Sequence, residues 1–272
     1  MSALVFDGRT HPEAGGFRVA AFSDVSSTNA VALEAAANGD EGNLWIVARR
    51  QTAGRGRRAR AWVSEPGNLY ASLLLIDPAT PERLAQLPIV AALALAHAVD
   101  HMCSAYHLAQ LKWPNDLLIG GRKISGILIE ASTGPDGRRA VVCGFGLNLA
   151  HHPDLPGYPT ADLAGLGYPV QPEAAYRALN QAMATQLDRW RREPFSAVLD
   201  DWRGRATGIG RPIRVRLADR ELEGVFVGLD DEGRLLLRGE DGANRVISAG
   251  DVFFPHVESE TGRSGGQTGV SL

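Results

Sequence analysis

The sequence KWPNDLLIGGRKISGILIE, residues 112–130, carries two apolar runs on either side of a Gly-Gly pair. Such runs around adjacent glycines predict a β-hairpin. Pro114 cannot donate to a sheet and restricts the residue before it, so Asn115 and Asp116 are expected to project from a strand end. A turn closed by the Asn and Asp side chains is the simpler alternative. A polar strand end is a suitable place for a binding site.

The chain before this hairpin alternates between predicted strands and helices. Short apolar runs predict strands at residues 17–22, 44–48 and 69–76. Ser26, Ser27 and Thr28 are N-cap candidates for a helix that ends near Gly39, and a long core helix is expected from Pro81 through Val99. Residues 49–68 form a long Gly/Arg loop, and loops of this length in compact domains are usually functional or disordered.

The chain after the hairpin predicts more sheet, then helices, then a β module. A turn at residues 134–137 leads into an apolar strand over 140–150, and residues 173–192 and 195–203 have helical periodicity. Beyond Arg205, four or five short strands separated by turns predict a small barrel. The expected division is an N-terminal extension (1–16), an α+β domain (17–205), a β module (206–257) and a disordered tail (258–272).

Composition narrows the classes of protein. The 272 residues include 28 basic and 31 acidic ones, and a net charge of −3 excludes a general nucleic-acid coat. No apolar run reaches the roughly 20 residues of a membrane span, and no export leader is recognisable, so we expect a soluble, cytoplasmic protein with no membrane partner. Cys103 and Cys143 are isolated, which argues against a disulfide scaffold and against a zinc site.

The basic residues are distributed unusually. Only Lys112 and Lys123 are lysines, and the other 26 basic residues are arginines. Two lysines eleven positions apart in such a chain suggest chemistry that a guanidinium cannot perform.

The segment Arg49 to Arg60, RRQTAGRGRRAR, holds six arginines and no acid. Its glycines allow backbone amides to approach a phosphate, while guanidinium groups bind phosphate or carboxylate in a bidentate way, so it predicts an anion site. A solvated charged loop is the simpler alternative. Arg55-Gly56-Arg57 also resembles a minor-groove DNA hook, but that reading is disfavoured because the segment lies between buried strands, lacks the following proline and occurs once.

Two further segments contain polar or small residues at predicted element ends. Gly144 and Gly146 in an apolar strand indicate a bulge or the close approach of a ligand, whereas the spacing of a dinucleotide fingerprint is absent. Ser26-Ser27-Thr28-Asn29 is explained most simply as a helix N-cap.

Four segments together resemble the biotin protein ligases, the biotin–[acetyl-CoA-carboxylase] ligase family. They occur in the family's order: SSTN (26–29), QTAGRGRRARAW (51–62), KWPNDLLIGGRKISGILIE (112–130) and GFGLN (144–148). The resemblance implies an α+β catalytic domain like that of class II aminoacyl-tRNA synthetases, with a mixed sheet and helices, followed by an SH3-like β-barrel. It also implies that ATP, with Mg²⁺, activates biotin as biotinyl-5′-AMP, which then modifies a lysine of a biotin carboxyl carrier protein.

The resemblance also implies roles for individual residues. The expected biotin-binding residues are Ser27, Thr28, Asn29, Gln51, Arg55, Gly56, Arg57, Trp62, Lys123 and Gly126. The expected nucleotide-binding residues are Arg58, Arg60, Lys112, Asn115 and Asn148, and Trp62 would also help to order the loop. Among the catalytic residues Arg57, Lys123 and Asp116, Lys123 would hold the biotin carboxylate and then the adenylate, while Asp116 is the candidate base or orienting carboxylate. Mg²⁺ would be bound mainly through ATP phosphates rather than by a protein cage.

Other interpretations stay open at this point. Only about twenty residues precede the catalytic domain, so we expect a monofunctional ligase without a DNA-binding repressor domain. A lipoate ligase shares the superfamily fold but has different motifs, and a non-catalytic biotin or adenylate sensor would keep the binding residues without transfer. A sheet edge is able to pair with a second copy or with the carrier, which leaves a homodimer possible.

Overall fold

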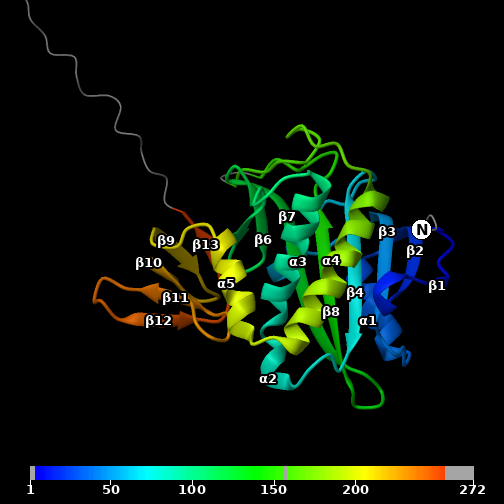
Figure 1. Cartoon of the computed structure of the whole chain (residues 1–272), viewed down its shortest axis with the longest axis horizontal. Coiled ribbons are helices and arrows are strands. Elements are labelled where there is room, and N and C mark those ends of the chain that lie inside the picture. The colour runs from blue at the N-terminus through cyan, green and yellow to red at the C-terminus, as the bar shows by residue number, and fades with distance from the viewer. Residues whose placement is uncertain (1–3, 156–157, 255–272) are drawn as a thin grey trace, which may run out of the picture.

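The computed structural model describes residues 4–155 and 158–254. Eight strands form one mixed sheet in the order β1-β2-β3-β4-β8-β7-β6-β5, in which only β2 and β3 are parallel neighbours (Figure 1). The strands are β1 (Thr10–Pro12), β2 (Arg18–Val25), β3 (Leu44–Gln51), β4 (Leu69–Ile76), β5 (Gln110–Lys112), β6 (Asp116–Ile119), β7 (Arg122–Thr133) and β8 (Arg139–Leu147). The predicted mixed α+β fold is confirmed, and part of the predicted N-terminal extension pairs with the sheet as β1.

Helices cover both faces of this sheet. The helices are α1 (Thr28–Ala37), α2 (Pro81–Leu84), α3 (Leu87–Met102), α4 (Pro172–Arg192) and α5 (Phe195–Arg205). Helix α1 buries Ala32 and Ala36 against one face of the sheet. The long helices α3 and α4 pack on each other and on the opposite face, where Trp45 and Trp190 are fully buried (Figure 1). Alternate residues of the central strands therefore face two separate apolar layers.

The single long helix predicted from Pro81 through Val99 is wrong. Two helices, α2 and α3, replace it, and α3 continues to Met102. Pro88 lies in the first turn of α3, where its missing amide hydrogen costs nothing. In a continuous helix the proline ring would clash with the carbonyl of Leu84, so the chain starts a new helix instead.

The hairpin predicted in residues 112–130 is present. Strands β6 and β7 pair through a turn at Gly120 and Gly121, both of which have positive φ angles. Trp113 and Pro114 connect β5 to β6 through a cis peptide bond. The Trp113 indole is buried and its Nε1 donates to the Gly233 carbonyl, 3.1 Å away, in the C-terminal part of the chain.

The C-terminal strands form a separate antiparallel sheet, which we call the β module. Its order is β12-β11-β10-β9-β13, and it lies to one side of the large sheet beside α5 (Figure 1). The strands are β9 (Pro212–Arg216), β10 (Glu221–Leu229), β11 (Leu235–Arg238), β12 (Asn244–Ile247) and β13 (Asp251–Phe253). The predicted disordered tail, 258–272, lies outside the described residues.

A buried ion pair fixes the end of α3 to α5. The Arg205 guanidinium lies 2.7 Å from an Asp100 oxygen, and the two side chains are only 5% and 8% exposed. The Asp100 carboxylate also accepts the backbone amides of His107, Leu108 and Ala109. The turn after α3 is thus organised around one charge.

Neutralising that charge is expected to destabilise the protein. Asp100→Asn leaves the buried Arg205 without its counter-charge, so the free energy of unfolding should fall by about 3 kcal/mol. Urea unfolding measures this, with Asp200→Asn, an exposed partner of Arg203, as the matched control. Equal stability of the two variants would show that the pair contributes nothing.

Candidate active site

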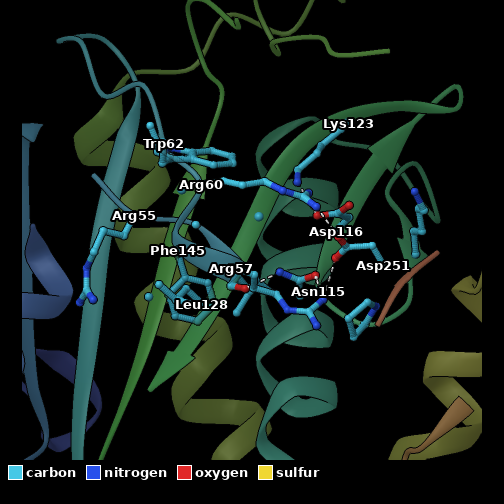
Figure 2. A pocket seen from close by; sticks show the side chains of 18 of the residues that line it. Arg55, Arg57, Arg60, Trp62, Asn115, Asp116, Lys123, Leu128, Phe145 and Asp251 are labelled. Carbon is cyan, nitrogen blue, oxygen red and sulfur yellow. Dashed lines mark hydrogen bonds and ion pairs between the residues drawn. The ribbon is translucent and has the colours of Figure 1, made fainter. Parts of the chain in front are cut away.

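A cavity of about 450 Å³ opens where α1, the loop after β3, the hairpin, β8 and the β module meet (Figure 2). Most of the predicted site residues line it. They are Ser27, Thr28, Asn29, Gln51, Arg55, Gly56, Arg57, Arg60, Trp62, Lys112, Asn115, Asp116, Lys123 and Gly126. The N-terminus of α1, the loop after β3 and the hairpin region therefore bring their polar side chains to one space.

Two predicted residues have their side chains elsewhere. Asn148 is buried and its Nδ2 donates to the Ala161 carbonyl, 3.0 Å away. Arg58 contacts Asp251 and the Arg216 carbonyl rather than the cavity. Their assignment to the nucleotide stays a prediction, and the structure gives both of them contacts within the protein.

The N-terminus of α1 forms a polar wall of the cavity. Ser27 is the N-cap residue, but its side chain makes no capping hydrogen bond. Instead, the Thr28 amide donates to Gln51 Oε1, at 2.8 Å, and Asn29 Nδ2 donates to Glu130 Oε2, also at 2.8 Å. The simple N-cap interpretation of SSTN is therefore incomplete, since these side chains are held by neighbouring strands at the cavity.

Glycines allow close packing at this wall. A Cβ atom on Gly144 would lie 2.1 Å from Asn29 Oδ1, and one on Gly146 would lie 2.5 Å from the Trp62 ring. The predicted close approach at these glycines is thus made by protein side chains. Trp62 Nε1 is buried against Gly146 without a hydrogen-bond partner among the described residues.

Both lysines of the chain meet around one carboxylate. Lys123 Nζ lies 2.5 Å from Asp116 Oδ1 (Figure 2). The other oxygen of Asp116 accepts the Tyr158 hydroxyl, which in turn accepts from Lys112 Nζ at 2.6 Å. Burial raises the pKa of Tyr158 well above its usual value, so the phenol keeps the proton that it donates to Asp116.

Lys112 is the more deeply buried lysine. Its side chain is 6% exposed, and its Nζ lies 4.2 Å from the centroid of the Tyr158 ring. Burial lowers the pKa of Lys112 to about 8; Asp116 and Asp251 oppose this change, and Lys123 adds to it. Lys112 therefore stays protonated at neutral pH, and burying its charge lowers the free energy of unfolding.

That cost predicts a pH dependence of stability. Between pH 8 and 10.5 the folded chain has lost the Lys112 proton while the unfolded chain keeps it. Raising the pH through this window therefore favours the folded state. We expect the unfolding free energy of the natural chain to rise relative to that of Lys112→Met by about 3 kcal/mol. Urea unfolding at pH 7 and pH 10.5 measures this, and a constant difference would contradict the lowered pKa.

Residues 52–61, which we call the arginine loop, reach from β3 across the cavity to the β module. Arg57 donates to Asn115 Oδ1 at 3.2 Å and to the Gly250 carbonyl at 3.1 Å. Burial lowers the pKa of Arg57, and Asp251 and Asp116 oppose that change. At the other end, Arg55 pairs with Glu130 at 2.9 Å. The loop is thus fixed at both sides of the cavity.

Sequence reasoning missed several residues of this site. Tyr158, Asp251 and Arg216 line the cavity, and Glu130 holds Arg55 and Asn29 from just outside it. Glu130 ends the quoted hairpin segment, so its position two residues after Leu128, which lines the cavity, could have indicated it. Tyr158 and Asp251 stand outside all four motifs, and no sequence signal points to them.

Two kinds of feature are absent from residues 4–155 and 158–254. No helix there is long and apolar enough to cross a membrane. No group of three or more His, Cys, Asp or Glu side chains is placed to hold a metal ion.

Comparison with known proteins decides the family. Residues 21–148 match the biotin/lipoate A/B protein ligase family, and residues 208–254 match the biotin protein ligase C-terminal domain. The chain is 42% identical over 237 residues to the biotin–[acetyl-CoA-carboxylase] ligase of Paracoccus denitrificans, covering 84% of this chain and 97% of that one. The chain belongs to the biotin protein ligase family. The family and the class of enzyme predicted from the four motifs are confirmed.

Other biotin protein ligases extend the comparison. The bifunctional ligase/repressor of Bacillus subtilis is 31% identical over 243 residues, which cover 83% of this chain and 70% of that protein. The biotin protein ligase from Aquifex aeolicus, in a complex with biotin and ATP, superimposes with a TM-score of 0.74 at 26% identity, covering 86% of this chain and 97% of that one. Both matched parts of this biotin protein ligase contribute to the cavity, since Arg216 and Asp251 come from the β module.

Proposed function

We propose that this chain activates biotin with ATP as biotinyl-5′-AMP and transfers the biotinyl group to a lysine of a biotin carboxyl carrier protein of acetyl-CoA carboxylase. The observation that carries the proposal is the cavity itself, in which Lys123, Arg57 and Arg60 face one space together with Asp116. The Paracoccus relative is named for this reaction, and the Aquifex structure holds both biotin and ATP.

The charges of the cavity suit the first step. A biotin carboxylate that attacks the α-phosphate of ATP must approach another anion, and two unit charges 4 Å apart repel by about 4 kcal/mol at an effective dielectric constant of 20. Lys123 and the arginines of the loop offset this repulsion. The new bond joins a carboxylate oxygen to phosphorus, and pyrophosphate leaves.

The two ends of the cavity suit the two substrates. Leu128, Phe145 and Gly144 provide an apolar surface beside Thr28 and Asn29, which suits a fused ring system that carries a urea group. At the other end, Lys112, Asn115 and the β-module residues Arg216 and Phe253 line the wall. We assign the first end to biotin and the second to the nucleotide.

Mg²⁺ is assigned to the phosphates of ATP rather than to a protein cage. The two carboxylates that line the cavity, Asp116 and Asp251, are each already paired with cationic side chains. Such a donor set does not fit a resident Mg²⁺, which in proteins commonly keeps several waters and binds substrate phosphates. When bound to ATP the ion would neutralise part of the phosphate charge.

In the second step the carrier lysine attacks the acyl carbon of the adenylate, forming an amide and releasing AMP. That lysine must first lose a proton, which costs about 4 to 5 kcal/mol at pH 7 from its ordinary pKa. Asp116 is assigned the role of the base or orienting carboxylate. We propose that the enzyme works in the cytoplasm and does not act as a DNA-binding repressor.

The test is a mass measurement on the carrier. The purified protein is incubated with ATP, Mg²⁺, biotin and a biotin carboxyl carrier domain, and a gain of one biotinyl group that requires ATP is expected. If adenylate forms but no tested carrier is modified, the chain is a sensor rather than a ligase. If no adenylate forms, the proposed reaction is wrong. DNA mobility shifts at several salt concentrations test the repressor alternative separately.

A further inference from the structure

Asp251 of β13 forms ion pairs with three arginines of the arginine loop. Its carboxylate lies 3.7 Å from Arg57 and 3.3 Å from Arg58, and Arg60 Nη2 also pairs with it. The Asp251 side chain is only 13% exposed. One carboxylate of the β module therefore stands against three guanidinium groups of the arginine loop, of which Figure 2 labels Arg57 and Arg60.

Backbone carbonyls of the same module reinforce this contact. Arg57 Nη1 donates to the Gly250 carbonyl and Arg58 Nη2 to the Arg216 carbonyl, at 3.1 and 2.9 Å. Asp251 and Arg216 are directly paired in adjacent strands. The acceptors for the loop thus occupy one edge of the β module and hold the loop as a unit.

The backbone of the loop needs such support. Arg58 has a φ angle of 54°, in the left-handed region that side chains other than glycine rarely adopt. This conformation turns the chain inside a short helical turn at Arg57–Ala59. A strained residue persists where surrounding contacts determine its conformation, and here Arg57 and Arg58 within the turn and Arg60 after it make the contacts with the β module.

The charge balance of the cluster allows the ion pairs between Asp251 and the loop arginines to be replaced by pairs with another anion. One carboxylate neutralises one of the three guanidinium groups, so this cluster keeps an excess of about two positive charges. Phosphate groups carry more charge and more acceptor oxygens than one carboxylate. The phosphate oxygens of an incoming triphosphate are therefore able to replace the Asp251 carboxylate as partners of these guanidinium groups. This exchange does not require the loop to change its backbone conformation.

We propose that Asp251 is a positioning residue, which holds the arginine loop over the cavity before substrates bind and yields Arg57 and Arg60 to the phosphates of ATP. The β module thereby pre-forms the nucleotide end of the cavity. The part of this inference that concerns ATP rests on the proposed function, whereas the tethering of the loop does not.

The first test is limited trypsin digestion of the whole, ligand-free protein. Asp251→Asn removes the charge that opposes the three arginines, so cleavage in the arginine loop, mapped by mass spectrometry, should accelerate about tenfold. Asp241→Asn is the matched control, because Asp241 pairs with Arg245 in the same module, away from the cavity. Asp251→Glu should restore most of the protection. Cleavage of Asp251→Asn at the natural rate would overturn the proposal.

The second test separates positioning from a merely structural effect. If the loop is pre-formed by Asp251, ATP must order it in the variant, so KM for ATP should rise about tenfold while kcat and KM for biotin change less than threefold. An unchanged KM for ATP in a variant with a freed loop would overturn the positioning role. Inactivity of the natural chain would instead contradict the proposed function and leave the digestion result to decide the tether.

A second variant covers failure of Asp251→Asn to fold. Arg58→Gln removes two of the contacts with the β module from the loop side, and Arg58 does not line the cavity. It should also speed cleavage after Arg60. Natural resistance of a folded Arg58→Gln protein would count against the tether.

Discussion

Lys123→Arg is expected to slow the formation of biotinyl-5′-AMP about 1,000-fold, which corresponds to about 4 kcal/mol. Lys123 Nζ lies 2.5 Å from Asp116 Oδ1, and the side chain is 17% exposed. The Nζ also lies 5.6 Å from the Trp62 ring centroid and 5.5 Å from that of Tyr158. A planar guanidinium keeps the charge but cannot enter the space of a compact ammonium among these groups.

The measurement is ATP- and biotin-dependent release of pyrophosphate under single-turnover conditions. Arg122→Lys is the matched control, because it makes the reverse exchange at the exposed neighbouring position and should leave the rate unchanged. Thermal unfolding establishes that both variants are folded. A rate within tenfold of the natural protein for Lys123→Arg would show that only the charge of Lys123 matters.

The sequence motifs predicted the cavity well because each motif is local. KWPND and the following hairpin place Lys112, Asp116 and Lys123 on the adjacent antiparallel strands β5, β6 and β7. Strand pairing alone therefore brings these three residues together. The Arg-rich segment likewise shows its concentration of positive charge by composition. In the hairpin the residues that meet in space are close in sequence, and periodicity and spacing report such contacts.

The residues that hold the motifs in place could not be predicted in this way. Asp251 is one acid among 31 in the chain, and its role depends on how the β module docks against the loop. That docking rests on long-range contacts such as the one between Trp113 and Gly233. Tyr158 follows β8 in a segment without regular structure, where no period constrains its position. Arg58 illustrates the same limit, since composition grouped it with the cavity arginines and the fold turned it toward Asp251.

Asp116→Asn is expected to lower the transfer of biotin from preformed biotinyl-5′-AMP to the carrier about 100- to 1,000-fold. The substitution keeps the shape of the side chain and removes its charge. Both oxygens of Asp116 are engaged, one with Lys123 and one with the Tyr158 hydroxyl. An incoming amine must therefore replace one of these partners, and Lys123 is the partner that the adenylate itself attracts.

The experiment is single-turnover transfer of labelled biotin from purified adenylate to the carrier domain, which bypasses the first step. Asp136→Asn, in an exposed turn, is the matched control. Tyr158→Phe provides a second comparison, because it removes the hydroxyl from Asp116 and leaves the carboxylate beside Lys123. If Asp116 is the base, Tyr158→Phe should keep most of the transfer rate that Asp116→Asn loses. Transfer at the natural rate by Asp116→Asn would leave the carboxylate only the role of orienting Lys123 in the first step.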